Sequence, residues 1–172
     1  MPNTKPVGVA FSDPELTSGT TITGATLDST TRVNSNIPAG FSVSQQGATI
    51  ATTGNSDVFI IAPAAGRLST ARFSGVDALT ANNSNFITFS ITNLGAAGSG
   101  SAAMLAATDA NTTKSTGGTA LSANTLRSLT LTGTAADLVV AAGDRLRIRA
   151  AATGTLANTV TFPVYSLTFT VA

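Results

Sequence analysis

The amino-acid sequence predicts an all-β protein, a jelly-roll-like antiparallel β-sandwich with an extended N-terminal arm. Segments with helical periodicity are scarce. Apolar residues instead alternate with Thr, Ser and Asn over stretches of strand length, and turn-rich segments separate these stretches. Roughly eight such stretches follow Asn55, which suits two packed sheets, with a jelly roll as the leading topology.

The chain of 172 residues is long enough for one domain with a sizeable core. We predict that residues 55–172 form the sandwich and that residues 1–54 form the arm, because no core-sized apolar face precedes Phe41. Fully stretched, about fifty residues reach roughly 170 Å, far enough to cross a neighbouring subunit. The alternative is that residues 7–11 and 20–27 are edge strands of the same sandwich.

Two strand-like runs, DVFIIAP and AAGRLSTARFSG, follow one another within residues 57–75. We expect them to pair as a hairpin, since small and turn-forming residues separate them. Pro63 ends the first run because it has no backbone donor, and Gly66 gives the turn its conformational freedom.

A strictly alternating stretch, NFITFSITN, occupies residues 85–93. Ile87, Phe89 and Ile91 share one face, and hydroxyl-bearing residues share the other, which is typical of a half-buried strand. A shorter stretch later in the chain places Leu129 on one face together with its neighbour two residues on. We expect strands at both places.

A long connection rich in Gly, Ala, Ser and Thr spans residues 95–118. Loops longer than about 12–15 residues tend to be functional or mobile. Within it, residues 101–110, SAAMLAATDA, are the best helix candidate, although the same segment could equally form a loop turn.

The last stretch, NTVTFPVYSLTFTVA, contains a shift of phase. Val160 and Val164 share one parity, whereas Tyr165 begins the run of the other parity. A strand cannot change faces without a defect, so we predict a bulge or bend near Pro163.

The composition excludes several classes of chemistry. The chain has no Cys and no His, so it lacks thiolate ligands and the commonest general base and metal ligand. A net charge of +1 argues against nucleic-acid binding. No apolar run has the roughly 18 residues of a membrane-spanning helix, and none resembles a signal peptide.

Catalytic residues are also thinly spread. Lys5 and Lys114 are the only lysines, and neither lies in a motif of serine–lysine enzymes. The single Glu and seven Asp are scattered, mostly in turn contexts. The segment TDANTTK, residues 108–114, loosely resembles a calcium loop but lacks the closing Glu, so an Asx-turn is favoured. We predict no enzyme, no cofactor and no metal site.

Arginine is concentrated in the segment VVAAGDRLRIRA, residues 139–150. Arg145, Arg147 and Arg149 occupy every second position, although the whole chain has nine Lys and Arg. A Gly-Asp turn between a short and a longer strand puts the arginines on the face opposite Leu146 and its apolar neighbours. Two interpretations stay open: a solvated face whose charges prevent unwanted sheet pairing, or a contact face for carboxylates of a partner.

The low charge content has two interpretations as well. Charged residues make up 10% of the chain, against about 25% in an average soluble protein. The polar surface must therefore consist mostly of Thr, Ser and Asn. Such a surface is easily desolvated and suits a protein packed against others, or it is simply a neutral soluble surface.

The runs VFIIAPAAGRLSTARFSG, NFITFSITNLG, TDANTTKSTGGTALSANTLRSLTLTG and VVAAGDRLRIRAAATGTLANTV, in this order, resemble capsid decoration (cement) proteins of tailed bacteriophages, of the jelly-roll type. The similarity covers residues 57–172. It implies a virion structural protein on the outer capsid surface that stabilises contacts between major capsid subunits, without cofactor or catalysis. It also implies a homo-oligomer, with a trimer favoured over a dimer.

A second resemblance uses part of the same pattern. An apolar run, AP, small residues, Gly and a strand, followed later by GD before a strand, is similar to C1q/TNF-like trimeric jelly rolls. That resemblance implies an adhesin or receptor-binding tip domain. The aromatic content of 5% argues against sugar-binding platforms of stacked rings.

Overall fold

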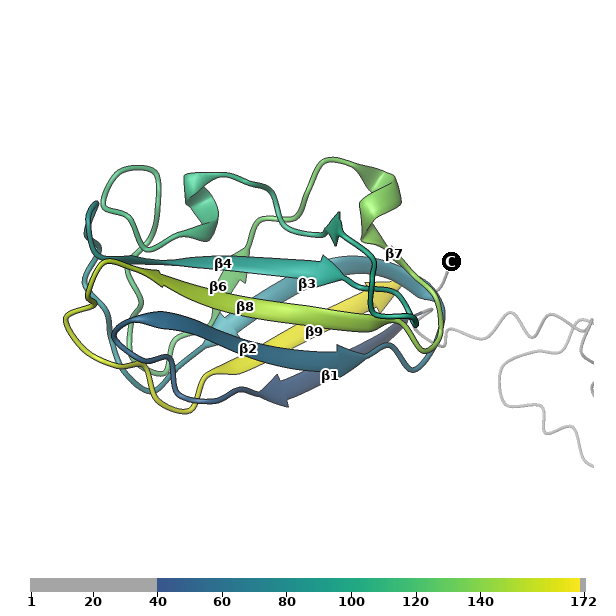
Figure 1. Cartoon of the computed structure of the whole chain (residues 1–172), viewed down its shortest axis with the longest axis horizontal. Coiled ribbons are helices and arrows are strands. Elements are labelled where there is room, and N and C mark those ends of the chain that lie inside the picture. The colour runs from purple at the N-terminus through teal and green to yellow at the C-terminus, as the bar shows by residue number, and fades with distance from the viewer. Residues whose placement is uncertain (1–39, 171–172) are drawn as a thin grey trace, which may run out of the picture. The chain divides into compact units, whose positions relative to one another are not determined.

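Two antiparallel sheets packed face to face make up the described part of the chain, residues 40–170 of a computed structural model (Figure 1). Sheet A has the strand order β1-β9-β3-β6, with β7 also paired to β3, and sheet B has the order β2-β8-β4-β5. The strands are β1 Gly40–Gln46, β2 Gly54–Ile61, β3 Gly66–Ser74, β4 Phe86–Asn93, β5 Ala102–Ala103, β6 Arg127–Leu129, β7 Val139–Val140, β8 Arg145–Thr153 and β9 Val164–Thr170. Two 3-10 helices, η1 Asp109–Asn111 and η2 Ala135–Leu138, lie along the β4 side of the sandwich, opposite β2.

The strand order is that of a jelly roll, which confirms the predicted fold class. The pairs β1–β9, β2–β8, β3–β6 and β4–β5 are successive rungs of one antiparallel ribbon. When such a ribbon is rolled up, alternate rungs fall into opposite sheets and bring β9 beside β3 and β8 beside β4. Residues 1–39 of the predicted arm lie outside the described residues.

Alternation along the strands builds the core between the sheets. In β4, Ile87, Phe89 and Ile91 are buried, as the sequence predicts. Phe73 of β3 lies 4.7 Å from the ring of Phe89 and 5.4 Å from the ring of Tyr165 of β9, so the rings from both sheets meet in the middle. Each such buried side chain stabilises the fold by about 1.5–3 kcal/mol relative to exposure, so the core holds the layers together.

The predicted hairpin within residues 57–75 is wrong. Strand β2 pairs with β8 in sheet B, whereas β3 pairs with β9, β6 and β7 in sheet A. The turn around Pro63 therefore carries the chain from one sheet to the other. Both runs alternate in a way that suits either arrangement, and the turn residues alone do not distinguish a hairpin from a crossing between sheets.

The sandwich begins earlier than the boundary predicted between residues 54 and 55. Strand β1 pairs with β9 over its whole length, and Phe41 stacks on Phe169 with ring centroids 4.7 Å apart. Only Phe41 and Val43 of β1 are packed against the core, both partly exposed. An edge strand with so small an apolar face gives a weak sequence signal, which explains the misplaced boundary.

The predicted shift of phase near Pro163 is confirmed. Val160 is buried and bridges to Ile50, and β9 then begins at Val164 with the opposite parity inward. Between them Phe162 adopts a positive φ of 47° and is 62% exposed. This one residue outside strand geometry resets the alternation.

The helix candidate at residues 101–110 is wrong, and the alternative of a loop is right. The segment contains β5 and the start of η1. Met104 and Leu105 are both buried. The chain pairs with its neighbours on both sides there: the Met104 amide donates to the Ile91 carbonyl, and Leu105 bridges to Leu131.

One buried hydroxyl in the core has no partner among the described residues. The Tyr165 hydroxyl is enclosed without a hydrogen bond, and this burial raises the pKa of Tyr165. An unsatisfied buried hydroxyl carries a desolvation penalty that no hydrogen bond offsets. We therefore expect Tyr165→Phe to leave the free energy of unfolding unchanged or to raise it by up to about 1 kcal/mol, measured by urea denaturation. A clear loss of stability would contradict this description of the site.

Candidate interaction surface

Strand β8 places the arginine stripe at the middle of the outer face of sheet B. It lies between β2 and β4 and pairs with both. Leu146 and Ile148 are 0% exposed beneath it, which confirms the predicted division between the two faces. The interpretation that these charges prevent sheet pairing is wrong, because a strand paired on both sides has no free edge to protect.

Arg149 forms an ion pair with a residue of the neighbouring strand. Its Nε and Nη2 atoms each donate to a carboxylate oxygen of Asp57 on β2, both over 2.6 Å. The two residues lie opposite each other in the register of β2 and β8. The hydrogen bonds from Arg149 lower the pKa of Asp57, so the pair stays charged well into the acid range. This arginine thus ties an edge strand to a central strand.

Arg145 and Arg147 have no carboxylate partner among residues 40–170. The Arg145 guanidinium lies 5.7 Å from the ring centroid of Phe59 on β2, and its Nη2 atom lies against Gly98. Arg147 lies opposite Phe59 and is partly buried, and its Nε has no acceptor within this part of the chain. Neither guanidinium forms a salt bridge within residues 40–170, although the charge of Arg147 contributes to the lowered pKa of Asp57.

Two large apolar side chains are exposed next to these arginines. Phe59 is 50% exposed and Ile61 is 56% exposed, in register with Arg147 and Arg145 respectively. We call these four residues the β2–β8 patch. Sequence reasoning predicted a strand over DVFIIAP but did not say that Phe59 and Ile61 would be exposed, so it missed the apolar half of the patch. The signal was present: four successive apolar residues make both faces of a strand apolar.

The outer face of sheet A is different in character. Its strands β1 and β9 carry pairs of hydroxyls that bond to each other, Ser42 with Thr168 and Ser44 with Ser166, both over 3.1 Å. The same face also exposes Val139 and Val164, together with Arg67 and Arg72. The largest exposed apolar side chains on the strands of the two sheets are nevertheless Phe59 and Ile61 of sheet B.

A groove of about 430 Å³ lies on the same side of the sandwich as the patch, along β4. The hydroxyl side chains of Thr88, Ser90 and Thr92 face it, and residues 103–114 form its opposite wall. This wall consists mostly of residues with small side chains, and Asp109 and Lys114 lie at one end of it.

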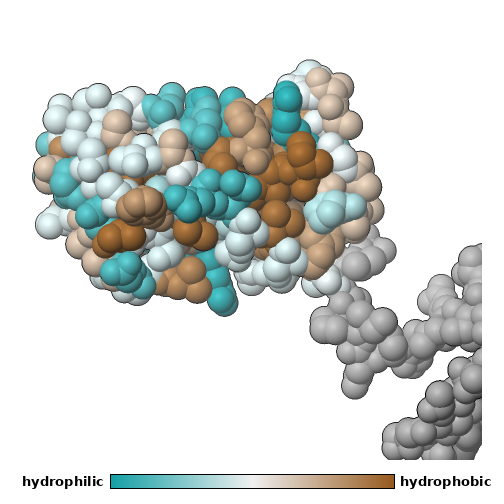
Figure 2. All heavy atoms as spheres, turned by 90° about the horizontal axis from the view of Figure 1, so that it is seen from below, coloured by the Kyte–Doolittle hydropathy of each residue, from teal (hydrophilic) through white to brown (hydrophobic). Residues whose placement is uncertain are grey.

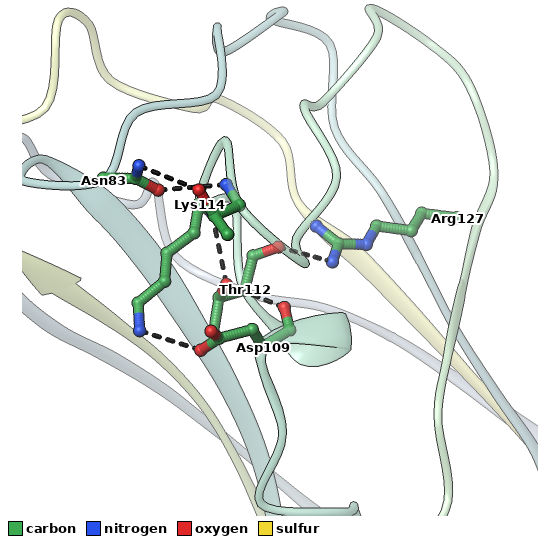
Figure 3. A network of polar contacts seen from close by, with 6 residues as sticks. Asn83, Asp109, Thr112, Lys114 and Arg127 are labelled. Carbon is green, nitrogen blue, oxygen red and sulfur yellow. Dashed lines mark hydrogen bonds and ion pairs between the residues drawn. The ribbon is translucent and has the colours of Figure 1, made fainter.

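Internal polar contacts hold that wall in place (Figure 3). Lys114 Nζ pairs with Asp109 Oδ1 at 2.8 Å, and the Asn83 side chain bonds to Thr116. Asn111, which sequence reasoning treated as an Asx-turn residue, is buried and bonds instead to backbone groups of Ala106 and Thr130. The connection is therefore packed structure, and its polar side chains are committed to it.

Arg127 fastens the far side of the same segment. Its guanidinium donates to the carbonyls of Ala110, Thr112 and Thr119 over 2.8–2.9 Å and lies 5.3 Å from the ring centroid of Phe89. Burial lowers the pKa of Arg127. One side chain thus donates to three backbone carbonyls of the irregular segment, of which the Thr112 carbonyl also accepts the Thr119 amide.

The described residues contain no group of three or more His, Cys, Asp or Glu that could hold a metal ion. Lys114, a candidate lysine for serine–lysine chemistry, is engaged by Asp109, and Lys5 lies outside the described residues. No helix between residues 40 and 170 is long and apolar enough to cross a membrane.

Comparison with known proteins gives no match: no family model, no curated protein and no solved structure matches the chain.

Replacing Arg127 tests the anchoring of the wall. Arg127→Met keeps much of the packing but removes three hydrogen bonds, so we expect a loss of about 2–3 kcal/mol in the free energy of unfolding. Denaturant unfolding measures it. Arg72→Met is the matched control: Arg72 is exposed on β3, and its loss should change stability by no more than about 0.5 kcal/mol. Equal effects of the two substitutions would contradict the anchoring role.

The pH dependence of stability follows from the aspartates. Asp144 accepts hydrogen bonds from the Ala141 amide and the Asn93 side chain, and these lower its pKa. A lowered native pKa stabilises the fold above the unfolded value of about 3.9, and this contribution is lost as the pH falls through the native value. We expect Asp144→Asn to reduce the thermal midpoint at pH 7 and to converge with the wild type as the pH approaches about 2.

Asp137→Asn serves as the control for that experiment, since the Asp137 carboxylate accepts no hydrogen bond from a described residue. Its melting curves should run parallel to the wild type at every pH. A constant difference between Asp144→Asn and the wild type down to pH 2 would exclude the proposed linkage.

Proposed function

We propose that the protein is a structural virion protein of a tailed bacteriophage that binds the outer capsid surface and stabilises contacts between major capsid subunits. The β2–β8 patch carries this proposal, because a half-exposed Phe and Ile lie beside two arginines that have no carboxylate partner between residues 40 and 170, and such a surface fits a protein-binding face. The jelly-roll strand order and the resemblance of residues 57–172 to capsid decoration proteins support it.

The proposed mechanism is additive binding by many copies. A homo-oligomer, most simply a trimer, would present several identical patches to the repeated surface of a shell. Modest contacts gain strength when they are linked, because the second contact forms within the first complex at high effective concentration. Each patch then needs to supply only a small apolar contact and a pair of charge-assisted hydrogen bonds.

The proposal leads to a direct assay. Purified full-length protein is added to phage capsids that lack it, and occupancy is measured by co-sedimentation and capsid stability by thermal denaturation. We expect saturable occupancy and a higher melting temperature of the shell. Arg67→Gln with Arg72→Gln, two exposed arginines of sheet A, should leave occupancy unchanged.

Binding to host cells without capsid occupancy would overturn the proposal and favour the adhesin or receptor-binding tip. Capsid occupancy that raises no melting temperature would remove the stabilising role while keeping the virion location.

A further inference from the structure

Strand β2 is the terminal strand of sheet B. It is eight residues long, and β8 is its strand partner in the described part of the chain. Its register with β8 is continuous, without a bulge. Figure 2 looks onto the side where β1 and β2 lie and shows apolar surface interspersed with hydrophilic residues.

The four terminal strands of the two sheets differ in how they are protected. Strands β5 and β6 have two and three residues, too short to template another strand. Strand β1 is longer, but its exposed side chains are mostly Ser and Gln. Strand β2 has no Pro and no Lys, its single charge at Asp57 is neutralised by Arg149, and Phe59 and Ile61 are exposed on it.

A long edge strand without these protective features is a template for strand pairing. We propose that β2 accepts an extended, carboxylate-bearing segment of a partner protein as an added strand of sheet B. The inference deepens the proposed function and rests on it for the source of the segment, a capsid subunit. Backbone pairing with β2 supplies affinity, and side chains of the added strand supply specificity.

The position of the arginines determines the chemistry of the segment. An added strand would lie about 4.8 Å beyond β2, with every second side chain on the outer face beside Phe59 and Ile61. The Arg145 guanidinium already extends from β8 to the ring of Phe59. Carboxylates on the outer side of the added strand would therefore meet Arg145 and Arg147 across β2.

A second copy of this strand is a poorer occupant. The outward side chains of β2 and β8 include three arginines and one aspartate, which gives a net charge of +2 on each copy. The only carboxylate that another β2 would bring is Asp57, which Arg149 already binds. Pairing two copies would leave Arg145 and Arg147 without anions and bring like charges together.

A peptide experiment with the full-length chain tests this inference without capsids. The probes are the peptide Thr-Glu-Val-Glu-Val-Glu-Val-Thr and its counterpart with Lys in place of each Glu. Fluorescence anisotropy measures affinity, and hydrogen exchange measured by mass spectrometry locates the protected segment. We expect the acidic peptide to bind and to protect residues 54–61, and the basic peptide to bind at least about tenfold more weakly.

Variants at the patch test whether the arginines and the edge of β2 carry the peptide binding. Arg145→Gln with Arg147→Gln should weaken the acidic peptide about tenfold or more. Ile61→Lys places on the edge the residue that natural edge strands use against pairing, and it should abolish binding. Leu126→Lys is the matched control, since Leu126 is 54% exposed on a loop before β6, and it should bind as the wild type does.

Three results would overturn the inference: equal binding of both peptides, protection at β1 instead of β2, and self-association that Ile61→Lys abolishes while no peptide binds. The last would assign the edge to a second copy. Peptide binding at β2 together with no capsid occupancy would keep the added strand and reject the capsid as its source, so the two proposals fail separately.

Discussion

The double pairing of strand β8 is the constraint on which the rest of sheet B depends. Its inward residues Leu146 and Ile148 are fully buried, so its register with β2 and β4 cannot slip without moving them into solvent. The same register fixes the arginines on the outer face. Because Arg149 lies opposite Asp57, the ion pair joins β2 to the sheet and leaves the other two arginines beside exposed apolar side chains.

The outer faces of the two sheets therefore differ in how their polar side chains are paired. On sheet A, neighbouring hydroxyls satisfy one another. On sheet B, the patch combines apolar area with two arginines that form no salt bridge in the described part of the chain, next to the terminal strand of the sheet. The packed segment beside β4, held by Arg127 and by the pair of Lys114 with Asp109, borders the opposite side of the sheet. Within the described residues, Phe59, Ile61, Arg145 and Arg147 therefore lie together along β2 and β8.

Much of this architecture could be predicted from the sequence, because alternation is a local property. It placed the strand at residues 85–93, the inward Leu146, and the phase shift near Pro163. The sheet to which a strand belongs is a non-local property, since it depends on partners far along the chain. The supposed hairpin around Pro63 failed for this reason.

The candidate surface could be predicted only in part for the same reason. The arginine stripe was visible as an alternating pattern, but the pairing of Arg149 with Asp57 joins residues 92 positions apart. The sequence predicted a strand that contains Phe59 and Ile61 but not their exposure, because exposure cannot be inferred from an apolar run alone. Arg127 gave no pattern at all, since its partners are backbone carbonyls of an irregular segment.

The most direct measurement of the central claim, that the outer face and edge of sheet B are the contact surface, is a cryo-EM map of the protein in its native assembly. The account predicts density of a neighbouring coat subunit against β2, with carboxylates at Arg145 and Arg147 and the hydroxyl-rich face of sheet A turned to solvent. A map with Phe59 and Ile61 facing solvent and sheet A against the shell would contradict it.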